Sequence, residues 1–107
     1  MKIRTWNIEA MTGYKPITTF YEDFSIADKF GMEAVKDTYK RGLESARFMG
    51  YKELTEFVMA LNWKIWEHCE QNEPLAKLYN DLWEEADVYA VENLKGEELQ
   101  YFYQTTD

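Results

Sequence analysis

The chain has 107 residues, 46% hydrophobic and 17% aromatic, which suits one hydrophobic core and excludes both a second domain and extensive disorder. The net charge of −8 disfavours direct binding to nucleic acid or to an anionic membrane. No uncharged stretch approaches the ~20 residues that cross a bilayer, and the N-terminus lacks the apolar segment of a secretory signal. We expect a single cytoplasmic domain spanning residues 1–107.

The first two dozen residues predict an extended arm. Residues 1–24 show no sustained helical period and contain a glycine, a proline and the β-branched run ITTFY. Their aromatic and aliphatic side chains are too apolar for a free tail, so we expect the arm to pack on the rest of the domain. Ser25 followed by Asp28 resembles a capping box, which predicts a helix from about Ile26 and a helical bundle over residues 25–107.

The segment from Gly31 to Gly50 predicts further helix. Apolar residues recur at helical spacing after Gly31, and Gly50 is a good terminator, so the chain forms either one kinked helix or two. The opposite side of this segment is basic. It is either a solvated face or a surface that meets the acidic C-terminal third of the chain, in a second copy or within the same copy. Its residues are Lys36, Lys40, Arg41 and Arg47.

Residues 52–71 predict the central helix of the bundle, because apolar residues occupy most of its circumference. One stripe at 100° per residue contains Leu54, Val58, Leu61, Ile65 and Cys69. A second, adjoining stripe contains Met59, Trp63 and Trp66. The narrow strip left for solvent contains Glu53, Glu56, Ala60, Lys64 and Glu67. We therefore expect partners on both stripes, with the single cysteine, Cys69, buried.

Two further helices complete the expected fold. Asn72 followed by Pro74 indicates a helix N-cap with proline in the first turn, after a short turn that makes the flanking helices antiparallel. From Leu75 the pattern is amphipathic, and Gly96 separates this outer helix from a short last one, EELQYFYQ. The predicted fold is all-α, a compact four- to five-helix bundle with an extended N-terminal arm packed on it.

One carboxylate pattern could hold a metal. Glu67-x-x-Glu70 and Glu84-x-x-Asp87 resemble the ExxE and ExxD pairs of the all-α nucleotide pyrophosphatases, which implies a Mg²⁺-dependent nucleotide hydrolase. However, Glu84 and Asp87 lie opposite the packing face of their helix. The single histidine, His68, also excludes a di-iron site built from two Glu-x-x-His motifs. We therefore expect no enzyme and no cofactor, with the hydrolase as the alternative.

A small pocket is the other candidate site. Asn62 interrupts the apolar pattern between the two stripes, and a buried amide needs hydrogen-bonding partners. It either pairs within the protein or lines a pocket together with Trp63 and Trp66. The tryptophans lack interleaved basic residues, so core packing or a protein interface explains them better than stacking on nucleic-acid bases.

Most of the net negative charge lies in residues 73–107, where nine acidic residues occur with two lysines. The runs FYEDFSIADKFG, LNWKIWEHCEQNEPLAKLYNDLWEEAD and ENLKGEELQYFYQTTD resemble small uncharacterised acidic proteins of bacterial phages and mobile elements. That resemblance implies a bacterial accessory protein and does not indicate any particular activity. We expect a protein that binds another protein, or itself as a homodimer, with mimicry of nucleic-acid phosphates as a second alternative. The expected surface contains Asp81, Glu84, Glu85, Asp87, Glu92, Glu97 and Glu98.

Overall fold

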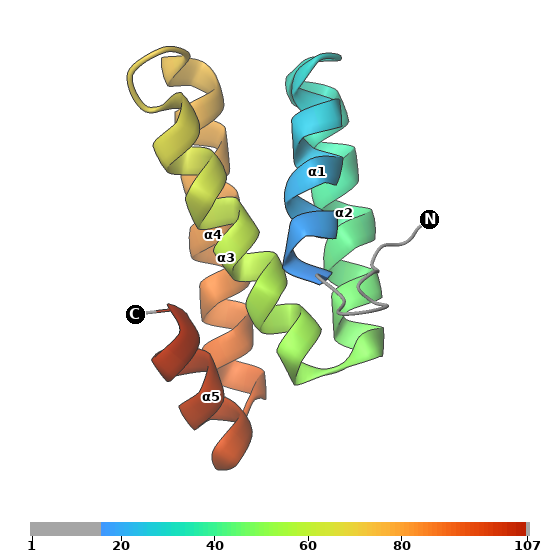
Figure 1. Cartoon of the computed structure of the whole chain (residues 1–107), viewed down its shortest axis with the longest axis vertical. Coiled ribbons are helices and arrows are strands. Elements are labelled where there is room, and N and C mark those ends of the chain that lie inside the picture. The colour runs from blue at the N-terminus through green and yellow to red at the C-terminus, as the bar shows by residue number, and fades with distance from the viewer. Residues whose placement is uncertain (1–15, 107) are drawn as a thin grey trace.

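Five α-helices and no strand form the part of the chain that the structure describes. The computed structural model describes residues 16–106, with side chains from residue 20 onward. The helices are α1 (Pro16–Asp28), α2 (Met32–Met49), α3 (Tyr51–His68), α4 (Glu73–Asn93) and α5 (Glu97–Thr106). Figure 1 shows α1 and α2 as one antiparallel pair and α3 and α4 as another, with α5 across the end of the second pair. The predicted all-α bundle is confirmed.

The first helix begins earlier than the sequence pattern indicates. α1 starts at Pro16 and not near Ile26, so the prediction of an extended conformation is wrong for residues 16–24. Proline fits a first helical turn, where its missing N–H would have no partner. Phe20 and Phe24, one turn apart, are both buried, and this packing outweighs the weak helix preference of the β-branched residues before them. The rest of the predicted arm, residues 1–15, lies outside the described residues.

The predicted helix boundaries are confirmed at three positions. Gly31 and Gly50 have φ angles of 107° and 138°, a region that favours glycine. Gly31 is the N-cap of α2, and Gly50 both ends α2 and begins α3. The chain from Ser25 to Met49 therefore forms two helices. Asn72 caps α4, because its side-chain oxygen accepts a hydrogen bond of 3.3 Å from the backbone N–H of Leu75.

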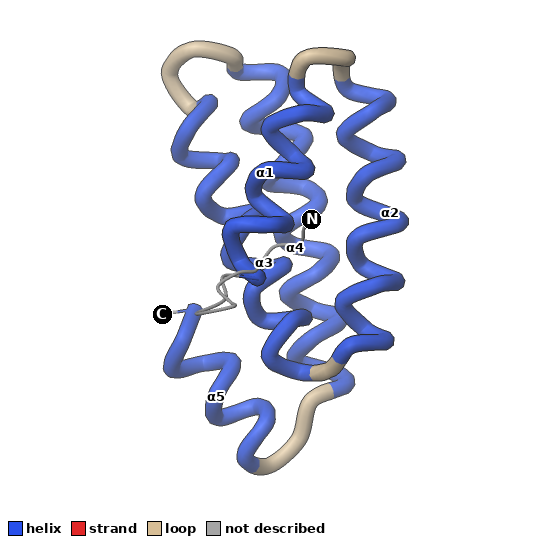
Figure 2. The backbone as a smooth tube through the Cα atoms, turned by 45° about the vertical axis from the view of Figure 1, so that its right-hand side comes forward, coloured by secondary structure: helices blue, strands red, loops and turns tan. Residues whose placement is uncertain are grey.

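The third helix lies at the centre, as predicted, and packs against all four of the others. Figure 2 shows α3 and α4 behind the α1–α2 pair. Phe57 of α3 is the hub of the aromatic core, with its ring centroid 5.4 to 5.7 Å from those of Phe20, Phe24 and Tyr39. Tyr79 of α4 extends this cluster by an edge-on contact with Phe24 at 5.5 Å. One continuous core therefore joins α1, α2, α3 and α4.

The orientation of α3 about its own axis differs from the prediction. Ala60 and Lys64, assigned to the solvent strip, are fully buried, whereas Trp63 and Trp66 of the second apolar stripe are 43% and 70% exposed. Lys64 is covered because its ammonium group pairs with Asp28 of α1. Burial of a lysine requires such a partner, and the partner lies on another helix. A pattern within α3 could not reveal it.

The last two helices follow the predicted pattern. α4 runs antiparallel to α3 (Figure 1). It buries residues of the predicted apolar face, such as Leu75, Tyr79 and Ala86. α5 contributes Phe102 to the core, and Tyr101 of α5 makes an edge-on contact with Tyr51 of α3 at 5.4 Å. Cys69 is exposed, so its predicted burial is wrong. It lies one residue beyond the end of α3, where the helical stripe no longer faces the core.

Candidate functional site

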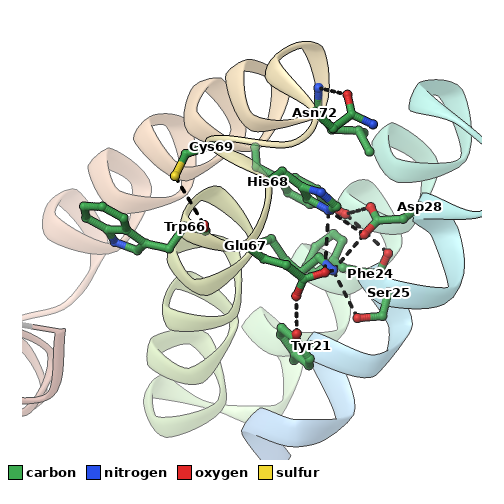
Figure 3. A network of polar contacts seen from close by, with 12 residues as sticks. Tyr21, Phe24, Ser25, Asp28, Trp66, Glu67, His68, Cys69 and Asn72 are labelled. Carbon is green, nitrogen blue, oxygen red and sulfur yellow. Dashed lines mark hydrogen bonds and ion pairs between the residues drawn. The ribbon is translucent and has the colours of Figure 1, made fainter.

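A buried lysine organises the main polar cluster of the protein. The ammonium nitrogen of Lys64 lies 2.7 Å from Asp28 Oδ2, 2.9 Å from Glu67 Oε2 and 3.1 Å from the hydroxyl oxygen of Ser25. A lysine ammonium has three hydrogen-bond donors, so all three are satisfied. Figure 3 shows the side chains of Ser25, Asp28 and Glu67 meeting between the last turns of α1 and α3. Ser25 and Asp28 therefore end α1; the prediction that they begin a helix is wrong.

Asp28 joins three helices. Its Oδ2 atom lies 2.8 Å from Nε2 of His68, the last residue of α3, and its Oδ1 atom accepts a hydrogen bond of 2.5 Å from the Tyr79 hydroxyl of α4. The His68 ring stacks on the Tyr79 ring, with centroids 5.8 Å apart and ring planes within 5°. We call Ser25, Asp28, Lys64, Glu67, His68 and Tyr79 the polar network. It fixes the C-terminal end of α1 to α3 and α4.

The charged groups of the network hold one another ionised. Burial raises the pKa of the Asp28 carboxyl, but hydrogen bonds from Lys64 and Tyr79 outweigh burial and hold this pKa below its usual range. Burial lowers the pKa of the Lys64 ammonium, but its bonds to Asp28 and Glu67 leave that pKa raised. For Glu67, burial is likewise outweighed by hydrogen bonds from Tyr21 and Lys64, so its pKa is lowered. Proton transfer at neutral pH needs a pKa near 7, which neither carboxyl has.

Three potential metal ligands meet within this network. Ligand atoms of Asp28, Glu67 and His68 lie within 4.8 Å of one another, the one such group among residues 16–106. Two carboxylates and an imidazole are a donor set that suits a divalent metal. However, the ammonium of Lys64 already lies between the two carboxylates. A cation of the protein itself therefore occupies the space between the two carboxylates and offsets part of their charge.

The carboxylates of the magnesium alternative do not gather. Glu67 belongs to the polar network, whereas Glu70 and Glu84 are exposed and Asp87 is half-buried. None of the residues Glu70, Glu84 and Asp87 belongs to a group of three potential metal ligands within the described part of the chain. Burial raises the pKa of Asp87. The two motifs thus do not meet in one cluster of potential ligands among residues 16–106.

An open groove lies beside the network. It has a volume of about 500 Å³ and is lined by Tyr21, Trp63, Trp66 and Glu67; we call it the aromatic groove. Tyr21 and Trp63 meet edge-on, with centroids 6.2 Å apart and ring planes at 71°. The Tyr21 hydroxyl donates a hydrogen bond to Glu67, as Figure 3 shows, and Trp66 extends away from the network. Asn62, for which the sequence left open either pairing within the protein or lining a pocket, is half-buried and is not among the residues that line this groove.

The acidic residues singled out in the sequence lie on α4 and in the first turn of α5. Six of the seven are exposed, and Asp87 is half-buried. Lys77 and Lys95, the basic residues of this part of the chain, are also exposed. We call the six exposed residues the acidic surface: Asp81, Glu84, Glu85, Glu92, Glu97 and Glu98.

The polar network as a unit was not predicted from the sequence. His68 and Glu67 were considered separately, Lys64 was assigned to solvent, and Ser25 and Asp28 were interpreted as a capping box. The sequence does contain one sign of the network. Lys64, Glu67 and His68 are spaced i, i+3 and i+4 along an apolar helix, which places the three side chains on one face. Asp28 lies 36 positions before Lys64 in the sequence, so no local spacing connects the two residues.

Comparison of the chain with protein-family models, with curated proteins and with solved structures found no match in any of the three. None of the described helices combines the length and the apolar character needed to cross a membrane. The function therefore has to be inferred from the charge, exposure and geometry of the residues themselves.

Proposed function

We propose that this protein is a small acidic interaction protein that binds a basic protein partner through its surface. The observation that carries the proposal is the acidic surface of α4 and α5, whose six carboxylates are exposed. A concentrated negative field speeds association with a positive partner and disfavours negatively charged ones. The net charge of −8 supports the same class of partner.

The internal chemistry supports binding over catalysis. Lys64 and Tyr79 keep Asp28 ionised, and Tyr21 and Lys64 do the same for Glu67. These carboxylates are therefore poorly suited to general acid or base catalysis at neutral pH. The dispersed positions of Glu70, Glu84 and Asp87 remove the geometric support for a magnesium-dependent hydrolase.

The basic side of α2 favours a separate partner over a second copy. Lys36 pairs with Glu33 at 3.3 Å, and Arg41 pairs with Asp37 at 2.8 Å, each within the same helix. The guanidinium carbon of Arg47 lies 5.1 Å from the centroid of the Tyr89 ring on α4. Much of the positive charge of α2 is thus already matched within one copy, which weakens its attraction for the acidic surface of another.

Binding of a deca-lysine peptide, measured by isothermal titration calorimetry from low to high salt, tests the proposal. The double substitution Glu84→Gln with Glu85→Gln should weaken binding by about two- to thirty-fold and flatten its salt dependence, because surface charges contribute ~0.2 to 1 kcal/mol each. The matched control substitutes two exposed glutamates outside this surface, Glu22→Gln and Glu44→Gln. Equal losses for the two double variants would show that net charge alone acts, and would contradict the proposal.

A further inference from the structure

Two tryptophans of the aromatic groove are exposed in a protein whose other tryptophan within the described residues, Trp83, is packed against the core. Trp66 is 70% exposed and Trp63 is 43% exposed. Both come from the last turns of α3, and the groove that they line also contains a carboxylate, that of Glu67. Tryptophan is enriched at the energetic centres of protein interfaces. The groove therefore joins apolar contact area to a fixed acidic group.

The charge of the polar network is not balanced from within. Asp28 and Glu67 carry two negative charges and Lys64 carries one positive charge, which leaves one negative charge when His68 is neutral. The Asp28 side chain is 14% exposed, whereas that of Glu67 is 38% exposed. Glu67 is therefore the member through which the excess charge reaches the groove and solvent. Charge complementarity requires a cationic occupant.

The groove is organised before any ligand binds. Tyr21 donates to Oε1 of Glu67 and Lys64 donates to Oε2, so the carboxylate is held from both sides. A carboxylate oxygen accepts more than one hydrogen bond, so Glu67 keeps acceptor capacity on its open side. The ammonium of Lys64 lies 4.9 Å from the centroid of the Tyr21 ring. The Glu67 carboxylate and the Tyr21 ring thus already hold one cation, the Lys64 ammonium, on the side that faces the protein. The side of the carboxylate that faces the groove is open.

We propose that the aromatic groove binds an arginine side chain presented by a basic protein. A guanidinium is planar and weakly hydrated, so it can stack on the exposed indoles while donating hydrogen bonds to Glu67. The ammonium of lysine is strongly hydrated, and a quaternary ammonium has no N–H to donate to Glu67. The open shape of the groove also suits a flat group. The proposal that an arginine is bound rests on the proposed function, which makes the partner a basic protein. It adds that an arginine side chain is the group of that partner which the groove recognises.

Three capped tripeptides test the proposal on the full chain, each with glycine on both sides of one variable residue. The variable residue is arginine, its neutral isostere citrulline, or trimethyl-lysine. Binding is followed by ¹H–¹⁵N NMR, in which each indole N–H gives its own signal. The arginine peptide should shift the indole signals of Trp63 and Trp66 and bind about five-fold more tightly than the citrulline peptide. Equal affinity of arginine and citrulline, or tighter binding of trimethyl-lysine, would overturn the proposal.

Variants locate the site. Trp66→Ala should weaken arginine binding by about five-fold with little effect on folding, because this side chain is largely exposed. Val88→Ala is the matched control, since Val88 is an exposed apolar residue of α4 and should leave binding unchanged. Glu67→Gln should also weaken binding, and the Trp66 variant keeps the test decisive if this substitution disturbs the fold. Unchanged binding in Trp66→Ala would refute the site.

The two proposals can fail separately. The Glu84→Gln and Glu85→Gln double variant should bind the arginine tripeptide like the unmodified protein, because its substitutions leave the residues that line the groove unchanged. Loss of deca-lysine binding in that variant together with no response of the groove to arginine would leave the proposed function standing and refute the inference. If the double variant binds deca-lysine like the unmodified protein while the groove responds to arginine, the acidic surface is refuted as the binding face and the groove is supported.

Discussion

Replacement of Lys64 by methionine tests the idea that the polar network holds α1 against the bundle. Methionine keeps the unbranched apolar stem and removes the ammonium group that lies between Asp28 and Glu67. Removal of one partner of a buried ion pair costs about 3 to 5 kcal/mol, because the other charge stays buried without compensation. Glu67 is partly exposed and can turn toward water, so we expect the lower part of this range, ~3 to 4 kcal/mol.

The size of this loss should depend on pH in a defined direction. In the unmodified protein the pKa of Asp28 is lowered, so its stabilising contribution is present above the unfolded value near 4 and is lost as the pH falls through the folded value. Without Lys64, burial is opposed only by the hydrogen bonds from Tyr79 and His68, so we expect the pKa of Asp28 to rise above that of the unfolded chain. As the pH falls, the folded variant then binds protons before the unfolded chain does, which stabilises it relative to the unfolded chain. The loss of stability should therefore be larger at pH 8 than at pH 5.

The free energy of unfolding, from urea titrations followed by circular dichroism at pH 5 and pH 8, measures the effect. Lys77→Met is the matched control, because Lys77 is exposed on α4, and it should change stability by less than ~0.5 kcal/mol. Adding Asp28→Asn to the Lys64 variant should cost less than the sum of the two single substitutions, because it removes the unpaired charge. A loss below ~1 kcal/mol, or the same loss at both pH values, would refute the reasoning.

Three further predictions concern other positions. Burial and the nearby Glu53 carboxylate raise the pKa of Glu56 to about 7. The folded state therefore binds more protons than the unfolded state between about 4.5 and 7, and stability falls as the pH rises through that window. Glu56→Gln should raise the free energy of unfolding at pH 8 by ~1 to 2 kcal/mol, after allowance for solvent screening, and change it little at pH 5. Gly42→Ala would place a Cβ atom 2.6 Å from Cε1 of the buried Phe57 ring. The resulting overpacking, about 1 to 3 kcal/mol, should exceed the ~1 kcal/mol gained in helix propensity, so the melting temperature should fall. The thiol of Cys69 is exposed and should react with Ellman's reagent in the folded protein.

Each of these predictions has a clear contrary result. A parallel dependence of stability on pH in Glu56→Gln and the unmodified protein would show that Glu56 does not titrate abnormally. A higher melting temperature for Gly42→Ala would show that the Phe57 ring moves aside without cost. Modification of Cys69 only under unfolding conditions would contradict its exposure. Ser45→Ala, an exposed substitution in the same helix as Gly42, separates helix propensity from packing.

Local chemistry was sufficient to predict most of the helix boundaries. Gly31, Gly50 and Gly96 each have a positive φ angle, and Asn72 caps α4 through its own side chain. These effects depend on a few neighbouring residues, so the sequence reveals them directly. The start of α1 was missed because the packing of Phe20 and Phe24 on other helices outweighs local preference there.

The amphipathic character of α4 could also be predicted, since one face is apolar and the other is charged. α3 is different, because apolar residues occupy two faces and either could lie inward. Lys64 on its buried side and Trp66 on its exposed side reverse what residue type alone suggests. The aromatic groove was only half anticipated, since Trp63 and Trp66 were identified but Tyr21 and Glu67 were not.

The sequence by itself determined the fold class, most helix ends, the excess of negative charge and its concentration in the last third of the chain. Only the tertiary structure decided which side of α3 is buried, that Lys64 pairs with Asp28, and that an open aromatic groove borders this pair. Helix ends and net charge follow from neighbouring residues and from composition. The burial of a charged side chain depends on a partner supplied by a distant segment, and that partner exists only once the helices have packed.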